Sequence, residues 1–142
     1  MGEAQALIAA LNLSWHPEGG WYRETWRAEA AAGERATATA ILFLLEAGQR
    51  SHWHKVDAAE LWFWHAGAPL TLLRSPDDAG PTQTTTLGPE VIAGHTPQVL
   101  IPQGHWQAAE ADADWSLVSC VVSPGLEFSG FMLAPPGWQP GS

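Results

Sequence analysis

Short apolar segments follow one another along this chain, separated by turns rich in glycine and proline, and few folds accommodate such a pattern. The spacing of these segments predicts strands that cover residues 21–27, 37–45, 51–56, 60–65, 70–74, 82–87, 98–101, 105–110 and 115–122, with a further strand within 126–133. Many short strands with little helix predict an all-β sandwich, jelly roll or barrel.

The two ends of the chain depart from this pattern. Apolar residues recur at helical spacing within residues 3–13, which predicts one short helix that ends before Pro17. The tail, residues 134–142, is too rich in proline and glycine for a regular element. Because no repeat or linker interrupts the sequence, we expect one domain over residues 1–142, with its core at about 5–133.

Charge and cysteine content exclude several classes of protein. The 142 residues carry a net charge of −9, with 15 acidic residues against 6 basic ones, which argues against a nucleic-acid or anionic-membrane partner. Cys120 is the single cysteine, so no disulfide framework exists. The N-terminus lacks the basic region of a signal peptide, and no apolar stretch has the length of a membrane span. We therefore expect a soluble, cytoplasmic protein.

A cluster of histidines and carboxylates carries the most specific chemistry. Strand alternation predicts that His52 and His54 project from one face, with Glu60 on the next strand. Imidazole and carboxylate are suitable ligands for a divalent Fe, Mn, Ni or Zn ion. A buried pair of His54 and Glu60 without metal is the competing interpretation, since buried polar groups need hydrogen-bond partners. Gln107 is expected to face inward from its strand after a Pro-x-Gly turn.

The chain has nine tryptophans, and some of them flank this cluster. Trp62 and Trp64 share the strand parity of Glu60, while Trp53 and Trp106 adjoin His54 and Gln107 in the sequence. These side chains either fill a small β core or form the wall of a pocket, and the sequence leaves both interpretations open.

Two motifs resemble the paired motifs of the cupin superfamily. The first is His52-x-His54, followed by Glu60 and, after six intervening residues, by Gly67; the second is Pro102-x-Gly104, followed by Gln107. The sequence departs from the family pattern in two ways. Five residues separate His54 from Glu60 where three or four are usual, and Gln107 stands where the fourth ligand is normally a histidine.

A longer series of motifs is similar to that of a small cupin subfamily of bacteria and fungi. It runs from His16-Pro-Glu-Gly-Gly to Ser116-Leu-Val-Ser-Cys120 and places about residues 5–133 in the subfamily. The resemblance implies a double-stranded β-helix (jelly-roll) cupin barrel with a short N-terminal helix, similar in fold to the dTDP-sugar 3,5-epimerases, and a homodimer. The apolar strand at 37–45, which needs covering, also favours the dimer. The expected ligand-binding residues are Glu18, Tyr22 and Arg23 at the pocket mouth, with Trp62, Trp64, Trp106 and Gln107.

Three functions remain open, since cupins host many chemistries. The first is an isomerase or epimerase of a small polar metabolite, such as a sugar or sugar nucleotide. In it His54 is the general base or acid, Glu60 orients it or shares its proton, and burial raises the carboxyl pKa and lowers the imidazole pKa. The second is a metal-dependent oxygenase or lyase whose ion is bound by His52, His54, Glu60 and, weakly, Gln107. The third is a non-catalytic domain that binds a small molecule.

Overall fold

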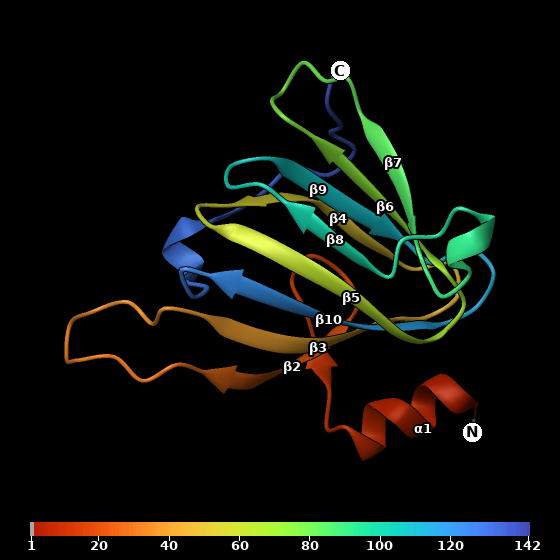
Figure 1. Ribbon diagram of the computed structural model, residues 1–142, viewed down its shortest axis with the longest axis horizontal. Coiled ribbons are helices and arrows are strands. Elements are labelled where there is room, and N and C mark those ends of the chain that lie inside the picture. The colour runs from red at the N-terminus through yellow and green to blue at the C-terminus, as the bar shows by residue number, and fades with distance from the viewer. Residues whose placement is uncertain (1) are drawn as a thin grey trace.

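The computed structural model describes residues 2–142, and this part of the chain is almost entirely β structure (Figure 1). A short helix, α1 (Glu3–Ala10), precedes eleven strands. The strands are β1 (Ser14–Trp15), β2 (Trp21–Arg27), β3 (Thr39–Leu45), β4 (Arg50–Val56), β5 (Ala59–Gly67), β6 (Leu70–Ser75), β7 (Gln83–Leu87), β8 (Gln98–Ile101), β9 (Trp106–Glu110), β10 (Ser116–Ser123) and β11 (Phe131–Leu133). Two 3₁₀ turns, η1 (Val91–Ala93) and η2 (Phe128–Gly130), complete the fold.

The strands form two antiparallel sheets that face each other. The first has the order β1-β2-β3-β10-β5-β8 and the second the order β11-β4-β9-β6-β7. From β3 to β6, and again from β7 to β11, each strand lies in the opposite sheet from the strand before it, so the chain crosses between the layers as a jelly roll does (Figure 1). The all-β jelly-roll prediction is confirmed.

The structure differs from the sequence prediction at the ends of elements and in three short elements that were not predicted, β1, η1 and η2. The helix ends at Ala10 instead of residue 13 because Asn12 adopts a left-handed conformation with φ 54°. Within 126–133, only Phe131–Leu133 is a strand, and the residues before it form η2. In the described part of the chain, no helix is long and apolar enough to cross a membrane.

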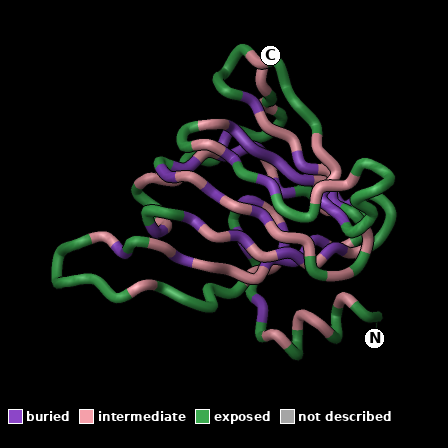
Figure 2. Tube along the Cα trace, viewed as in Figure 1, coloured by how far each residue is buried: buried purple, intermediate pink, exposed green. Residues whose placement is uncertain are grey.

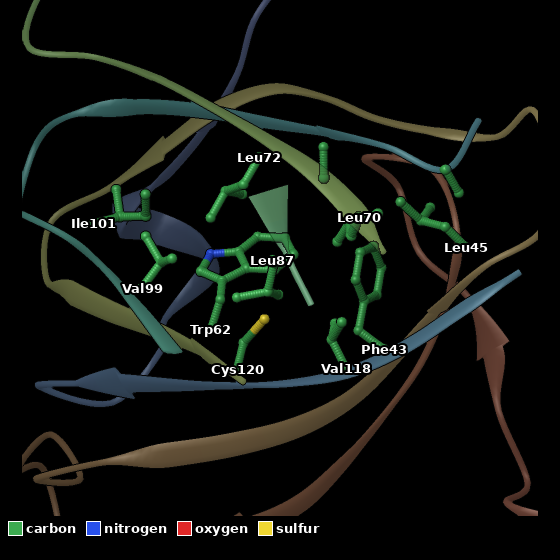
Figure 3. Close-up of a cluster of buried hydrophobic side chains, with 12 residues drawn as sticks. Phe43, Leu45, Trp62, Leu70, Leu72, Leu87, Val99, Ile101, Val118 and Cys120 are labelled. Carbon is green, nitrogen blue, oxygen red and sulfur yellow. The ribbon is translucent and has the colours of Figure 1, made fainter. Parts of the chain in front are cut away.

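An apolar cluster fills one part of the space between the sheets (Figure 3). Phe43 and Leu45 of β3, Trp62 of β5 and Val118 of β10 are at most 1% exposed there. Figure 2 shows buried segments in the sheets, whereas the β2–β3 connection and the helix are mostly exposed. Toward the start of β3 the interior changes character, because Thr39 lines a polar pocket in place of apolar side chains.

The C-terminal tail packs on the outer face of the second sheet. Trp53 of β4 and Trp106 of β9 form an outer apolar cluster with Ala134, and Trp138 packs against it. The rings of Trp106 and Trp138 have centroids 4.5 Å apart. The tail has no helix or strand, as its composition predicts, yet it covers two large aromatic side chains.

Candidate functional site

A polar pocket lies inside the barrel, beside the apolar cluster. It is lined by His16, Glu18, Thr39, Ile41, His54, Val56, Glu60, Cys120, Val122, Leu126 and Phe131. The space open to the centre of a water molecule is only about 20 Å³, which is room for about one water. Two imidazoles and two carboxylates therefore surround a small, nearly closed space.

His54 and Glu18 form an ion pair at the centre of this pocket. Nε2 of His54 lies 2.9 Å from Oε2 of Glu18, and the two side chains are 2% and 6% exposed. Nδ1 of His54 lies 2.7 Å from the carbonyl oxygen of His52, to which it donates. With an acceptor at each ring nitrogen, the imidazole of His54 carries two protons and a positive charge.

A tight turn brings Glu18 into the barrel. Residues 16–20 connect β1 to β2, and the backbone carbonyl of Glu18 accepts a 2.7 Å hydrogen bond from the amide of His52. Gly19 has φ +104°, and a Cβ at this position would collide with the backbone carbonyl of Arg50. The Gly19-Gly20 sequence thus permits the close approach to β4 that places Glu18 beside His54.

The ion pair sets the ionisation of both partners. Burial by itself lowers the pKa of His54, but the charge of Glu18 and the hydrogen bond to it outweigh burial and raise the pKa to about 9. Burial raises the pKa of Glu18, but the charge and hydrogen bond of His54 outweigh this and lower it. The expectation of a lowered imidazole pKa is therefore wrong for His54, because Glu18 compensates the cost of burying its charge.

Glu60 occupies a different environment in the same pocket. Its Oε1 accepts a 2.8 Å hydrogen bond from Nε2 of Gln107, and Oε1 of Gln107 accepts a 2.7 Å hydrogen bond from the indole of Trp62. Burial is the main cause that raises the pKa of Glu60, and Glu18 raises it further. The prediction that burial raises the pKa of the Glu60 carboxyl is confirmed. The indole of Trp62 determines which way the amide of Gln107 points.

His16 and Cys120 complete the polar lining. Nδ1 of His16 accepts a 3.1 Å hydrogen bond from the backbone amide of Glu18, and burial lowers the pKa of His16. Burial raises the pKa of the Cys120 thiol well above its usual range. At neutral pH these two groups are uncharged, so the charges of the pocket are those of Glu18, His54 and, when ionised, Glu60.

His52 does not join His54, contrary to the prediction from strand alternation. Ser51 pairs with Ala109 and His54 with Gln107, so β4 has an extra residue between these two pairs. This bulge turns His52 out of the barrel, where its Nε2 lies 2.9 Å from the carbonyl oxygen of Pro135. A bulge leaves no signal in a pattern of alternating residues.

The predicted metal ligands do not fit an ion. His52 faces the tail, both ring nitrogens of His54 have partners, and the amide of Gln107 bridges Trp62 and Glu60. Within residues 2–142, no group of three or more His, Cys, Asp or Glu side chains is arranged to hold a metal. These predicted ligands therefore do not support a metal-dependent step.

The other expected ligand-binding residues occupy varied positions. Trp62 belongs to the apolar cluster and reaches the pocket only through Gln107, and Trp64 packs against that cluster with its indole bonded to Ala68. Trp106 lies outside the barrel. Tyr22 contacts the ring of His16 at 4.5 Å between centroids, whereas Arg23 is exposed. Of the residues expected at the pocket mouth, Glu18 alone lines the pocket.

Among the lining residues absent from the predicted site are two with aromatic rings, His16 and Phe131. His16 opens the His-Pro-Glu-Gly-Gly motif, which indicated a turn and pocket-mouth residues beyond it but did not single out His16 itself. Phe131 stacks on His54 with ring centroids 5.4 Å apart and lies 6.0 Å from the ring of His16. A single phenylalanine near the end of the chain carries no motif, so only the pairing of β11 with β4 reveals its position.

Comparison with known proteins gives the same fold. Protein SO0799 from Shewanella oneidensis is 40% identical with a TM-score of 0.87, over 94% of this chain and 85% of that one. A hypothetical protein from Leishmania major is 30% identical with a TM-score of 0.85, over 94% and 88%. Oxalate decarboxylase from Bacillus subtilis is 15% identical with a TM-score of 0.64, over 84% of this chain and 29% of that one, which is a likeness in fold alone.

A search of curated proteins gives no match. The family described as "Cupin superfamily (DUF985)" matches residues 5–134, which is nearly the whole chain. This match and the relatives at 40% and 30% identity agree with the jelly-roll fold. The chain therefore belongs to the DUF985 family of the cupin superfamily.

Proposed function

We propose that this protein binds a small polar metabolite, such as a sugar derivative, at the barrel pocket and moves a proton on it, as isomerases and epimerases do. The observation that carries the proposal is the contrast between two buried carboxyls in one pocket. Ion pairing lowers the pKa of Glu18, whereas burial raises the pKa of Glu60. Two carboxyls whose pKa values are shifted in opposite directions are typical of sites that use one as an ion and the other as a proton carrier.

Glu60 is the proton carrier in this proposal. Gln107 donates to Oε1 of Glu60, and the Cys120 thiol is a further, weak donor to this carboxyl. A stronger donor on a ligand in the pocket would displace the thiol. The raised pKa of Glu60 lies nearer to neutral pH, and a general acid or base is most efficient when its pKa is near the working pH. Its ionised form removes a proton from a carbon next to a carbonyl group of the metabolite, and its protonated form returns the proton to a carbon of the same molecule.

His54 stabilises the charge that develops on the ligand. When the proton leaves, the electron pair moves to the carbonyl oxygen, and the positive charge of His54 stabilises the resulting oxyanion. Because both ring N–H groups are already donated, His54 acts through its charge and not as the base. The proton and the electron pair both return to the metabolite, so the reaction consumes no oxidant and no co-substrate.

The test is hydrogen exchange with solvent. The protein is incubated in D₂O with a panel of sugars, sugar phosphates, sugar nucleotides and small hydroxy and keto acids, and proton NMR follows loss of carbon-bound hydrogen and formation of isomers. We expect exchange on at least one compound, reduced by about a hundredfold or more in Glu60→Gln. Glu24→Gln, at an exposed ion pair with Arg27, is the matched control and keeps full activity.

Two results would contradict the proposal. Exchange that survives in Glu60→Gln would remove that residue from the proton-transfer step. Saturable binding of a panel member without any exchange or isomer would support the non-catalytic binding domain instead.

We also propose that the protein is a homodimer. Trp15 of β1 and Trp26 of β2 are more than half exposed at one edge of the six-stranded sheet. Large aromatic side chains on an edge are typical of surfaces that a partner covers. Sedimentation equilibrium should give twice the 15.3 kDa mass of the chain, and a monomer at micromolar concentration would contradict this.

A further inference from the structure

A second cavity adjoins the barrel pocket, and the two share a wall. It is an outer groove of about 310 Å³ between the end of β4, the loop before β9 and the η2–β11 segment. Val56 and Phe131 line both the groove and the barrel pocket. The groove has the volume of a small-molecule site, whereas the barrel pocket holds about one water.

Lys55 is the one side chain lining the outer groove that carries a positive charge. Lys55 is the only lysine of the chain and takes part in none of the ion pairs formed within residues 2–142. Its ammonium group lies over the Trp106 ring, 4.8 Å from the centroid. The carboxylate of Asp57, which also lines the groove, is already paired with Arg35 at 2.7 Å. A positive charge therefore remains available there, in a chain whose net charge is −9.

Phe131 is one of the two side chains that the outer groove shares with the charged pocket. It stacks on the imidazole of His54, and the short strand that carries it pairs only with β4. Three residue pairs hold β11 in place, which include Phe131 with Val56 and Met132 with Lys55. A strand with so few pairs at a sheet edge is among the easier elements of a fold to displace.

We propose that the outer groove binds the carboxylate or phosphate group of the metabolite at Lys55, and that movement of Phe131 admits the rest of the molecule to the barrel pocket. The inference rests on the proposed function, since it assigns a class to the same ligand, namely small anionic metabolites. A molecule anchored at Lys55 presents its uncharged end to Phe131 and, once the ring moves, to Glu60. The charged group of the ligand then occupies the outer groove, and its uncharged, reacting part occupies the barrel pocket.

Anion binding is tested with simple probes. Because Lys55 is the only lysine, protein labelled with ¹³C-lysine gives one side-chain signal, which is followed during titration with inorganic phosphate and with malonate at constant ionic strength. We expect a saturable shift with at least one anion, and the anion that saturates identifies the phosphate or the carboxylate as the recognised group. Sodium chloride should give no saturable shift.

Two variants assign the binding to Lys55. In Lys55→Met, the backbone amides of Gly104 and Ser129 should report an affinity lower by about tenfold or more, the effect of losing one charge-assisted contact. Arg50→Met, which removes a cation at the far end of the same strand, should bind as the wild type does. Equal affinity in Lys55→Met, or the absence of saturation with both anions, would overturn the proposal.

The role of Phe131 is tested through the single cysteine. Cys120 is 1% exposed and lines the barrel pocket, so its rate of modification by the neutral reagent methyl methanethiosulfonate measures access past Phe131. We expect Phe131→Ala to accelerate labelling by about tenfold or more, and the bound anion to slow it. Leu133→Ala, an exposed residue of the same strand that lines neither cavity, is the matched control and should not accelerate it.

Equal acceleration in both variants, with urea unfolding showing that both remain folded, would contradict a barrier at Phe131. The measurements also separate this inference from the proposed function. Glu60→Gln should keep full anion affinity even where it abolishes exchange, so saturable binding at Lys55 without turnover would contradict only the proton-transfer reaction. Turnover that Lys55→Met leaves unchanged would contradict only the anion site.

Discussion

Replacing Glu18 with glutamine removes one charge from the buried ion pair and leaves the other in place. The amide oxygen of glutamine still accepts a hydrogen bond from Nε2 of His54, but it no longer compensates the charge of the imidazolium. Burial then dominates, so we expect the pKa of His54 to fall far below its value of about 9.

The size of the effect follows from the pKa of His54. A rise from 6.5 in the unfolded chain to about 9 in the folded protein corresponds to about 3 kcal/mol of folding free energy. Because the folded pKa is the higher one, this stability is fully present below pH 6.5 and is lost as the pH rises through about 9. We expect Glu18→Gln to lose about 3 kcal/mol near pH 6, and the difference from the wild type to shrink above pH 9.

The assay is urea unfolding of wild type and variant at a series of pH values, followed by tryptophan fluorescence. Glu24→Gln, at an exposed pair with Arg27, is the control and should lose less than about 1 kcal/mol at each pH. A loss in Glu18→Gln that is as small as the control's, or that does not change between pH 6 and 10, would refute the argument that His54 is a buried cation.

Two further predictions concern groups that hold the pocket in shape. Gln107→Leu leaves the indole of Trp62 and one oxygen of Glu60 without partners, so thermal or urea unfolding should show a loss of about 2–4 kcal/mol; a loss below 1 kcal/mol would contradict the bonded geometry. Gly19→Ala forces a Cβ against the carbonyl of Arg50 and should lose more than about 1 kcal/mol, with displaced His52 amide signals in NMR spectra; an unchanged spectrum would contradict the close packing of the turn.

The sequence was sufficient to predict the jelly roll and most strands, because period-two apolar segments and glycine-proline turns are local signals. Residues 21–27 and 98–101 form strands with the predicted bounds, and other strands differ by one or two residues at most ends. The family resemblance was correct as well, since the DUF985 family matches residues 5–134.

The interior of the site was harder to predict, for physical reasons. One extra residue in β4 reverses the direction of His52 without changing the residue pattern. The charge of His54 depends on Glu18, which lies 36 positions away and reaches the barrel only through a glycine turn. Phe131 becomes part of the pocket through pairing between strands that are distant in the sequence. Long-range contacts of this kind have no counterpart in local spacing.

The most direct test of the account is a carboxyl ¹³C NMR titration of Glu18 and Glu60 in the same sample, with Glu18→Gln and Glu60→Gln to assign the two signals. We predict midpoints on opposite sides of pH 4.5, with Glu18 below it and Glu60 above it. Two carboxyls that titrate together, or in the reverse order, would contradict the claim that this pocket separates a permanent anion from a proton carrier.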